Sequence, residues 1–155
     1  MKNSFLGALL IVVKHADSII DPWALTGSMN HWLQGVNVKP NDIDLISTKT
    51  GAMNLTKELN SYIVKPVTYH EEKTIRSWYG ALRIGEIDIG LMGEIENFSP
   101  LKNCWLTHEN WQENIIFIKT NDFRIPCLSL RYEHYVYEKL GFLERAALIK
   151  KLSEI

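Results

Sequence analysis

Apolar and polar residues along this chain follow patterns that predict both helices and strands. Helices are expected near the ends, over residues 4–20 and over residues 129–155, where Gly141 would interrupt the second one. Between them, strands are predicted at 23–27, 41–47, 63–69, 74–84, 86–95, 115–119 and 123–127, with short helices at 28–35 and 52–60. Residues 96–112 show no regular pattern. This order predicts an α+β fold in which helices pack on a mixed, mostly antiparallel sheet.

Length and composition favour one soluble domain spanning residues 1–155. The chain is 46% hydrophobic and 23% charged, and its formal net charge of −1 provides no general attraction to nucleic acid or anionic membranes. The apolar run Phe5–Val13 is shorter than the ~20 residues that a membrane-spanning helix needs. Cys104 and Cys127 form no metal-binding or disulfide pattern. We therefore expect a cytoplasmic protein without membrane contact, and nucleic acid is disfavoured as a partner.

Residues 27–44 carry the strongest chemical signal. Gly27 permits a tight turn, and Ser28 places a hydroxyl at the start of a helix, whose N-terminus suits phosphate groups. Asp42 and Asp44 alternate with an apolar residue, so both carboxylates should lie on one face of a strand. A divalent cation, Mg²⁺ or Mn²⁺, would relieve the repulsion between them. The pattern predicts metal-assisted chemistry on a triphosphate.

Two further residues are candidates for nucleotide binding. His31 follows Gly27-Ser28 on the same short helix and could contact a phosphate or an acceptor. Arg76 could bind triphosphate oxygens through its forked guanidinium. A half-buried histidine and a solvated strand face are the structural alternatives. The chain lacks GxxxxGK[ST], GxGxxG and Gly-x-Ser-x-Gly, which argues against P-loop, Rossmann and esterase sites.

The segment 23–45, with its Gly-Ser and Asp-Ile-Asp motifs, resembles the nucleotidyltransferase fold of the DNA polymerase β-like superfamily. The similarity is to the small single-domain proteins grouped with aminoglycoside and lincosamide adenylyltransferases. It continues through 75–80, 91–95, 125–130 and 132–141, and covers roughly residues 5–150. The resemblance implies transfer of a nucleoside monophosphate from a nucleoside triphosphate to a hydroxyl of a small-molecule acceptor, with release of pyrophosphate.

One position departs from the pattern that this resemblance implies. A third carboxylate is expected two residues before Met92-Gly93, where this chain has Gly90. Asp88, on the same strand face about 7 Å away, is the preferred substitute as metal ligand and base. Glu94 is the second substitute. The alternative function is a nucleotide-binding module without turnover, in a regulatory or antitoxin-like role.

The C-terminal segment offers an apolar helix face. This face consists of Tyr132, Tyr135, Tyr137 and Leu140, and either core packing or a homodimer contact would explain it. Because little chain lies outside the core of the implied fold, acceptor recognition is expected from this helix or from a second subunit.

Overall fold

The computed structural model describes residues 2–154. Its α-helices are α1 (Lys2–Ala16), α2 (Gly27–Leu33), α3 (Lys49–Glu58), α4 (Leu130–Leu140) and α5 (Leu143–Ser153). Its strands are β1 (Trp23–Thr26), β2 (Ile43–Ser47), β3 (Ile63–Glu71), β4 (Ile75–Ile84), β5 (Ile87–Ser99), β6 (Cys104–Thr107), β7 (Ile115–Thr120) and β8 (Phe123–Leu128). Two short 3-10 turns, Asn60–Tyr62 and Trp111–Asn114, precede β3 and β7.

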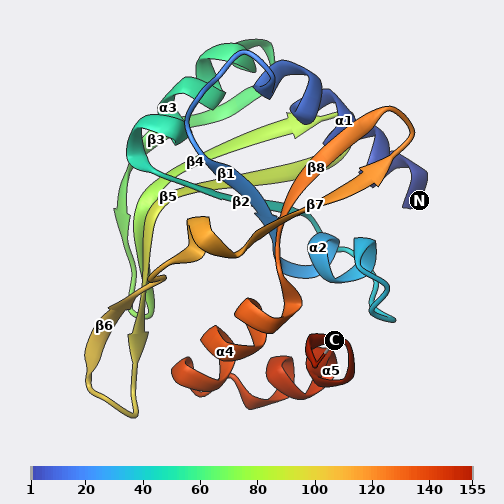
Figure 1. The fold of residues 1–155 in the computed structure, drawn as a ribbon. Helices are drawn as coiled ribbons and strands as arrows, with labels where there is room; N and C mark the ends of the chain where they lie inside the picture. The colour runs from blue at the N-terminus through green and yellow to red at the C-terminus, as the bar shows by residue number, and fades with distance from the viewer. Residues whose placement is uncertain (1, 155) are drawn as a thin grey trace.

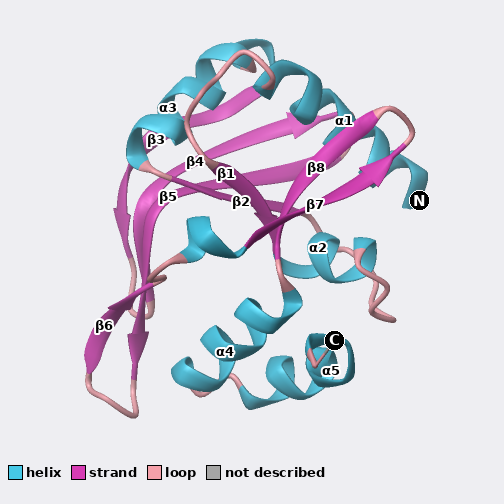
Figure 2. Cartoon of the chain, viewed as in Figure 1, coloured by secondary structure: helices cyan, strands magenta, loops and turns pink. Residues whose placement is uncertain are grey.

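The strands form one mixed sheet in the order β3-β4-β5-β2-β1-β8-β7 (Figure 2). Strand β2 runs parallel to β5, and β1 runs parallel to β8, whereas the other neighbours in this order are antiparallel. Strand β6 pairs with the end of β5 outside this order. The predicted α+β class, with a mixed sheet flanked by helices, is confirmed.

Helices α1 and α3 cover one face of the sheet, and the main core lies beneath them (Figure 1). Its fully buried side chains include Leu9, Val12, Leu25, Leu45, Leu55 and Leu91. Burying one such leucine stabilises the fold by about 1.5–3 kcal/mol relative to leaving it exposed. In β2, Ile43 and Leu45 point into this core, so the residues that alternate with them face the opposite side, where α4 and α5 lie (Figure 1).

Two predicted boundaries are wrong, each for a local reason. Helix α1 ends at Ala16 rather than at residue 20, because the chain turns there and Ile19 N–H donates to the carbonyl of Ala16. The segment 96–112 is not irregular throughout, since β5 continues to Ser99 and forms a hairpin with β6. Glu94, within β5, adopts a left-handed conformation with φ 52°. This irregularity breaks the alternation of apolar and polar residues along β5, so the sequence pattern did not predict its second half.

The predicted interruption at Gly141 is confirmed. Gly141 has φ 80° and ends α4, and its N–H bonds the carbonyl of Glu138. The C-terminal segment is therefore a pair of helices rather than one.

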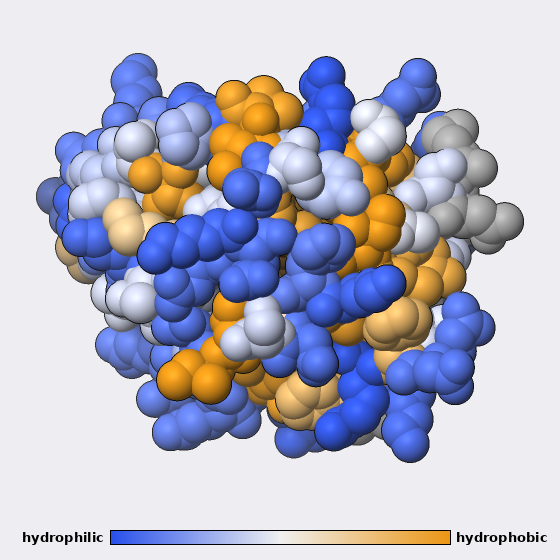
Figure 3. All heavy atoms as spheres, turned by 90° about the horizontal axis from the view of Figure 1, so that it is seen from above, coloured by the Kyte–Doolittle hydropathy of each residue, from blue (hydrophilic) through white to orange (hydrophobic). Residues whose placement is uncertain are grey.

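No helix among the described residues is long and apolar enough to cross a membrane. On the side that α1 and α3 cover, apolar side chains reach the surface in separate groups between polar and charged ones (Figure 3).

Gly93 of β5 lies against the start of α3, and a substitution there tests how closely the two elements pack. A Cβ atom at Gly93 would lie 2.8 Å from the carbonyl oxygen of Thr48 and 3.0 Å from Cα of Lys49. Because both are backbone atoms, we expect Gly93→Ala to lower the free energy of unfolding by about 1–3 kcal/mol. Gly7→Ala is the control, since a Cβ there meets no atom within 4 Å, and the helix should gain about 0.5–1 kcal/mol. Urea unfolding measures both, and a neutral Gly93→Ala would contradict this packing.

Candidate active site

Asp44 lies at the centre of the sheet, on the face opposite the main core. In register it lies between Thr26 of β1 and Gly90 of β5. Asp42 precedes it on the same face, and both side chains line one cavity. Burial, the charge of Asp42 and the charge of Glu133 raise the pKa of Asp44 to about 7, while Arg145 lowers it. The structure thus brings the two predicted carboxylates together.

The turn at Gly27 lies directly against Asp44. Gly27 has φ 75°, and a Cβ atom built on it would lie 2.9 Å from Oδ2 of Asp44. A side chain at this position would therefore displace the carboxylate. Ser28 accepts a hydrogen bond of 3.1 Å from the backbone N–H of Asn41, which fixes the segment before Asp42. The predicted Gly-Ser turn and Asp-x-Asp strand are adjacent in space.

Glu133 of α4 connects the C-terminal helices to this turn. Its buried carboxylate accepts hydrogen bonds from the Thr26 hydroxyl and, at 3.2 Å, from the Gly27 N–H. Its other oxygen pairs with Nε2 of His31. His31, a predicted phosphate contact, is therefore buried in a contact with Glu133, and its ring meets the Tyr137 ring edge-on. Sequence reasoning assigned no role to Glu133, although it lies in the family-like segment 132–141, because its contacts are with residues about one hundred positions away.

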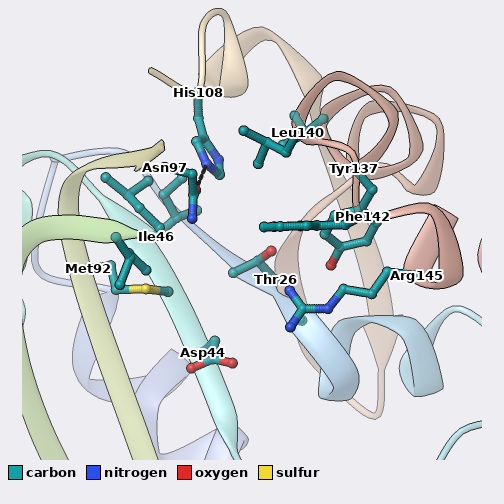
Figure 4. A pocket seen from close by; sticks show the side chains of 14 residues that line it. Thr26, Asp44, Ile46, Met92, Asn97, His108, Tyr137, Leu140, Phe142 and Arg145 are labelled. Atoms are coloured by element: carbon teal, nitrogen blue, oxygen red, sulfur yellow. Dashed lines mark hydrogen bonds between the residues drawn. The ribbon is translucent and has the colours of Figure 1, made fainter. Parts of the chain in front are cut away.

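Two cavities meet at Asp44. The first, here called the polar cavity, has a volume of about 340 Å³ and is lined by Gly27, Ser28, His31, Val38, Lys39, Asn41, Asp42, Asp44, Tyr137, Arg145 and Leu148. The second, here called the apolar cavity, has a volume of about 270 Å³ and lies between the sheet and helices α4 and α5 (Figure 4). Both share Gly27, Asp44, Tyr137 and Arg145.

Arg145 of α5 supplies positive charge next to the carboxylates. Its guanidinium carbon lies 4.9 Å from the centroid of the Phe142 ring and 6.0 Å from that of Tyr137. These aromatic contacts orient the cation. Figure 4 shows the guanidinium extending from the helix toward the side of the cavity where Asp44 lies. No sequence motif marked Arg145, because its relation to Asp44 depends on how α5 folds back.

Two predicted site residues lie outside both cavities. Asp88 is largely exposed near the start of β5, and its carboxylate accepts a 2.8 Å hydrogen bond from Arg83. Arg76 bonds Glu96 at 2.9 Å and Glu71 at 3.4 Å. Each side chain is thus already paired, and the roles of Asp88 and Arg76 in the site stay predictions.

Gly90 leaves the space beside Asp44 without a carboxylate. A Cβ there would lie 3.1 Å from Oδ1 of Asp44 and 3.6 Å from the hydroxyl of Tyr79. Glu94, the second substitute, instead accepts a 3.3 Å hydrogen bond from the Lys49 N–H at the start of α3. Its carboxylate is therefore directed at a helix on the other side of the sheet.

The donor set suits a cation that arrives with a phosphate ligand. Among residues 2–154, no group of three or more histidine, cysteine, aspartate or glutamate side chains could hold a metal ion. Mg²⁺ is commonly bound by one or two carboxylates, substrate phosphates and water. Asp42 and Asp44 match that requirement, because a cation would offset the repulsion that raises the pKa of Asp44.

Asp44 should lower the stability of the metal-free protein at neutral pH. Because its pKa in the folded state lies above the ordinary value of 3.8, its stabilising contribution is complete at low pH and is lost as pH rises from about 4 to about 7. Asn cannot ionise, so Asp44→Asn avoids this loss of stability. The substitution should raise the free energy of unfolding at pH 8 by about 1–3 kcal/mol. The gain should vanish near pH 4.

Urea unfolding at several pH values, without divalent cations, measures the effect of Asp44→Asn. Asp88→Asn is the control, since its exposed carboxylate pairs with Arg83. Equal free energies of unfolding for Asp44→Asn and the wild type at pH 8 would show that the ionised Asp44 carboxylate does not destabilise the fold.

Glu133→Gln tests the connection between α4 and the Gly27 turn. The amide keeps the shape but loses the charge that holds three donors, so we expect a loss of about 1–3 kcal/mol in stability. Glu138→Gln is the matched control on the same helix, because Glu138 is exposed and pairs only with His134 at 3.2 Å among the described residues. It should change stability by less than about 0.5 kcal/mol. Similar unfolding midpoints for the two variants would rule out a structural role for Glu133.

Comparison with solved structures identifies proteins that share this fold. A protein from Thermotoga maritima, described provisionally as a nucleotidyltransferase, aligns with a TM-score of 0.82 and 29% identity over 100% of this chain and 96% of that one. The antibiotic-resistance factor ANT(2'')-Ia gives 0.55 and 14% over 98% and 86%. The lincosamide antibiotic adenylyltransferase LnuA, in its lincomycin-bound structure, gives 0.52 and 17% over 94% of each chain. At these identities, the last two show a shared fold.

No curated protein sequence matches this chain. The profile of the aminoglycoside-2''-adenylyltransferase family matches residues 8–155, nearly the whole length. The chain, with its Gly-Ser turn and paired aspartates on a mixed sheet, therefore belongs to the aminoglycoside-2''-adenylyltransferase family.

Proposed function

We propose that this protein transfers a nucleoside monophosphate from a nucleoside triphosphate to a hydroxyl of a small-molecule acceptor and releases pyrophosphate. The observation that carries the proposal is the placement of Asp42 and Asp44 beside the Gly27 turn, where two cavities meet. The family name points to an adenylyl group, and hence to ATP as the donor.

The polar cavity suits the triphosphate. Lys39 and Arg145 bring two positive charges to a cavity that also contains the Ser28 hydroxyl. These cations would offset the charge of the phosphates in the presence of Asp42 and Asp44. Gly27 adds no side chain, which leaves the turn accessible to a phosphate group.

Asp42 and Asp44 are the proposed ligands of Mg²⁺ or Mn²⁺. When bound, such an ion neutralises charge on the phosphate oxygens. Glu133 has a different proposed role, since its contacts with Thr26 and Gly27 hold the turn at a fixed position against Asp44. Positioning of this kind accounts for much of the rate enhancement in phosphoryl-type transfer.

In the proposed reaction, the acceptor hydroxyl oxygen bonds to the α-phosphorus while the bond from that phosphorus to the bridging oxygen breaks. Pyrophosphate takes the electron pair of the broken bond. The hydroxyl proton passes to a carboxylate, for which we propose Asp88, on the same strand face as Gly90. Asp88 would take the proton on Oδ2, since its Oδ1 accepts the hydrogen bond from Arg83.

A nucleotide-binding module without turnover is the second candidate. It is favoured by one observation, the absence of a carboxylate at Gly90 next to Oδ1 of Asp44. Such a module would bind a nucleoside triphosphate through the same cavity and release no pyrophosphate.

Asp42→Asn and Asp44→Asn should each lower pyrophosphate release by about 100-fold or more, because each removes charge that holds the cation. The assay uses labelled nucleoside triphosphates, Mg²⁺ and a panel of hydroxylated acceptors. Glu86→Gln, on the exposed turn before β5, is the control and should retain wild-type activity. Nucleotide binding without pyrophosphate release from the wild-type protein, across the whole panel, would favour the second candidate.

The role of Asp88 is tested in the same assay. Asp88→Ala should slow turnover by about 10-fold to 100-fold if its carboxylate takes the proton. Arg83→Ala is the matched variant, because it frees Asp88 without removing it. Full turnover by Asp88→Ala would eliminate Asp88 as the base.

A further inference from the structure

The side chain of Tyr79 borders the space that Gly90 leaves open beside Asp44. A Cβ atom built on Gly90 would lie 3.1 Å from Oδ1 of Asp44, 3.5 Å from Cε2 of Tyr79 and 3.6 Å from the Tyr79 hydroxyl oxygen, and these are its three nearest neighbours. The carboxylate and the phenol therefore border one space. It is the space in which the resemblance described above implies a third carboxylate.

The strand register shows how Tyr79 reaches this place from β4. Gly90 is paired with Asp44 of β2 and with Ala81 of β4, whereas Tyr79 is paired with Met92. Directly opposed residues share a face of the sheet, and Figure 4 shows Met92 and Asp44 on the same face. The ring of Tyr79 nevertheless contacts the position of Gly90, two residues before Met92. The side chain thus leans along the sheet toward Asp44.

Two side chains of the edge strand β3 hold the Tyr79 ring. The His70 ring meets it edge-on, with the ring centroids 5.8 Å apart, and the Lys65 ammonium nitrogen lies 5.9 Å from its centroid. Contacts of both kinds favour a particular orientation of the ring. Neither contact involves the hydroxyl group, so the polar end of Tyr79 is not used by them.

The hydroxyl group of Tyr79 is free to bind a ligand. Within residues 2–154 it makes no hydrogen bond. Solvent reaches it, because every fully buried side-chain oxygen or nitrogen in this part of the chain has a hydrogen-bond partner, and Tyr79 lines a cavity of about 240 Å³. Its oxygen can therefore accept a hydrogen bond from a ligand that enters the space beside Gly90.

A water molecule is the ligand that suits this space. A Mg²⁺ or Mn²⁺ ion held by Asp42, Asp44 and phosphate oxygens keeps several water ligands, because these groups do not fill its coordination shell. Groups that hydrogen-bond the ligands of a metal ion fix their orientation and strengthen its binding. Beside Oδ1 of Asp44, the Tyr79 hydroxyl is in the position to do this.

We propose that Tyr79 is a positioning residue, whose hydroxyl oxygen accepts a hydrogen bond from a water molecule bound to the cation at Asp42 and Asp44. This inference rests on the proposed function, which supplies the cation and its two carboxylate ligands. The lone pair of the water faces the cation, so one of its O–H groups donates to the phenol oxygen. A neutral water thus takes the place of a third carboxylate as ligand. Tyr79 neither gains nor loses a proton, and Asp88 keeps its proposed role as base.

The test measures binding of Mn²⁺ together with α,β-methylene-ATP, which cannot be cleaved at the α-phosphorus. Water-proton relaxation enhancement distinguishes the protein-bound complex from the free one. Tyr79→Phe keeps the ring and removes the oxygen, so the dissociation constant should rise about tenfold. Tyr69→Phe is the matched control, because the Tyr69 hydroxyl bonds Glu71 at 3.3 Å and its ring contacts Trp78. It should change the constant by less than about twofold.

Gly90→Asp tests whether a water molecule occupies this space. The new carboxylate would bind the cation directly and displace the water, so the complex should bind about tenfold more tightly and relax water protons less. In the Gly90→Asp background, Tyr79→Phe should change the dissociation constant by less than about twofold, because the partner of its hydroxyl is gone.

Should Gly90→Asp fail to fold, Gly90→Ala provides the same comparison. Its methyl group takes up the space beside Oδ1 of Asp44, so the complex should bind about tenfold more weakly than to the wild type. Adding Tyr79→Phe to Gly90→Ala should then weaken binding by no more than about twofold.

Equal dissociation constants for the wild type and Tyr79→Phe would overturn the proposal, as would an effect of Tyr79→Phe that persists in full beside Gly90→Asp. If Asp44→Asn abolishes binding and Tyr79→Phe leaves it unchanged, only the role of Tyr79 is refuted. No binding to the wild type would refute the proposed function and this inference together. A tenfold effect of Tyr79→Phe without pyrophosphate release for any acceptor would support the role of Tyr79 and refute the transferase activity.

Discussion

The buried carboxylate of Glu133 is the contact on which the candidate site depends. It joins α4 to the last residue of β1, to the Gly27 turn and to His31 of α2. Helices α4 and α5 contribute walls to both cavities, so their position relative to Asp44 defines the space available to ligands. A buried carboxylate is tolerated only when donors satisfy it, and here Thr26, Gly27 and His31 do so.

This contact also concentrates negative charge around Asp44. Burial, Asp42 and Glu133 all raise its pKa, whereas Arg145 lowers it. Such a cluster opposes folding at neutral pH, whereas the leucine-rich core beneath α1 and α3 favours it. This excess of negative charge is what the proposed Mg²⁺ or Mn²⁺ ion, brought by a nucleotide, would offset.

Local sequence predicted the parts of the site that lie close together in the chain. Gly27, Ser28, Asp42 and Asp44 fall within eighteen residues, and the strand period alone places both aspartates on one face. Glu133 and Arg145 come from the C-terminal helices, and their approach to Asp44 depends on the break at Gly141 and on tertiary packing. Periodicity contains no information about such contacts, which is why charged residues on α4 and α5 could not be sorted into site and surface.

The departure at Gly90 is part of the packing rather than an isolated change. A Cβ there would approach Oδ1 of Asp44 to 3.1 Å and a ring carbon of Tyr79 to 3.5 Å. Burial and the charges of Asp44 and Asp42 raise the pKa of Tyr79, so its hydroxyl stays neutral beside the carboxylates. A carboxylate at position 90 would place a third negative charge beside Asp44 and in contact with Tyr79. Position 90 thus adds no negative group to the carboxylate pair, and in the proposed reaction any proton acceptor must come from a neighbouring position on the strand or from the bound reactants.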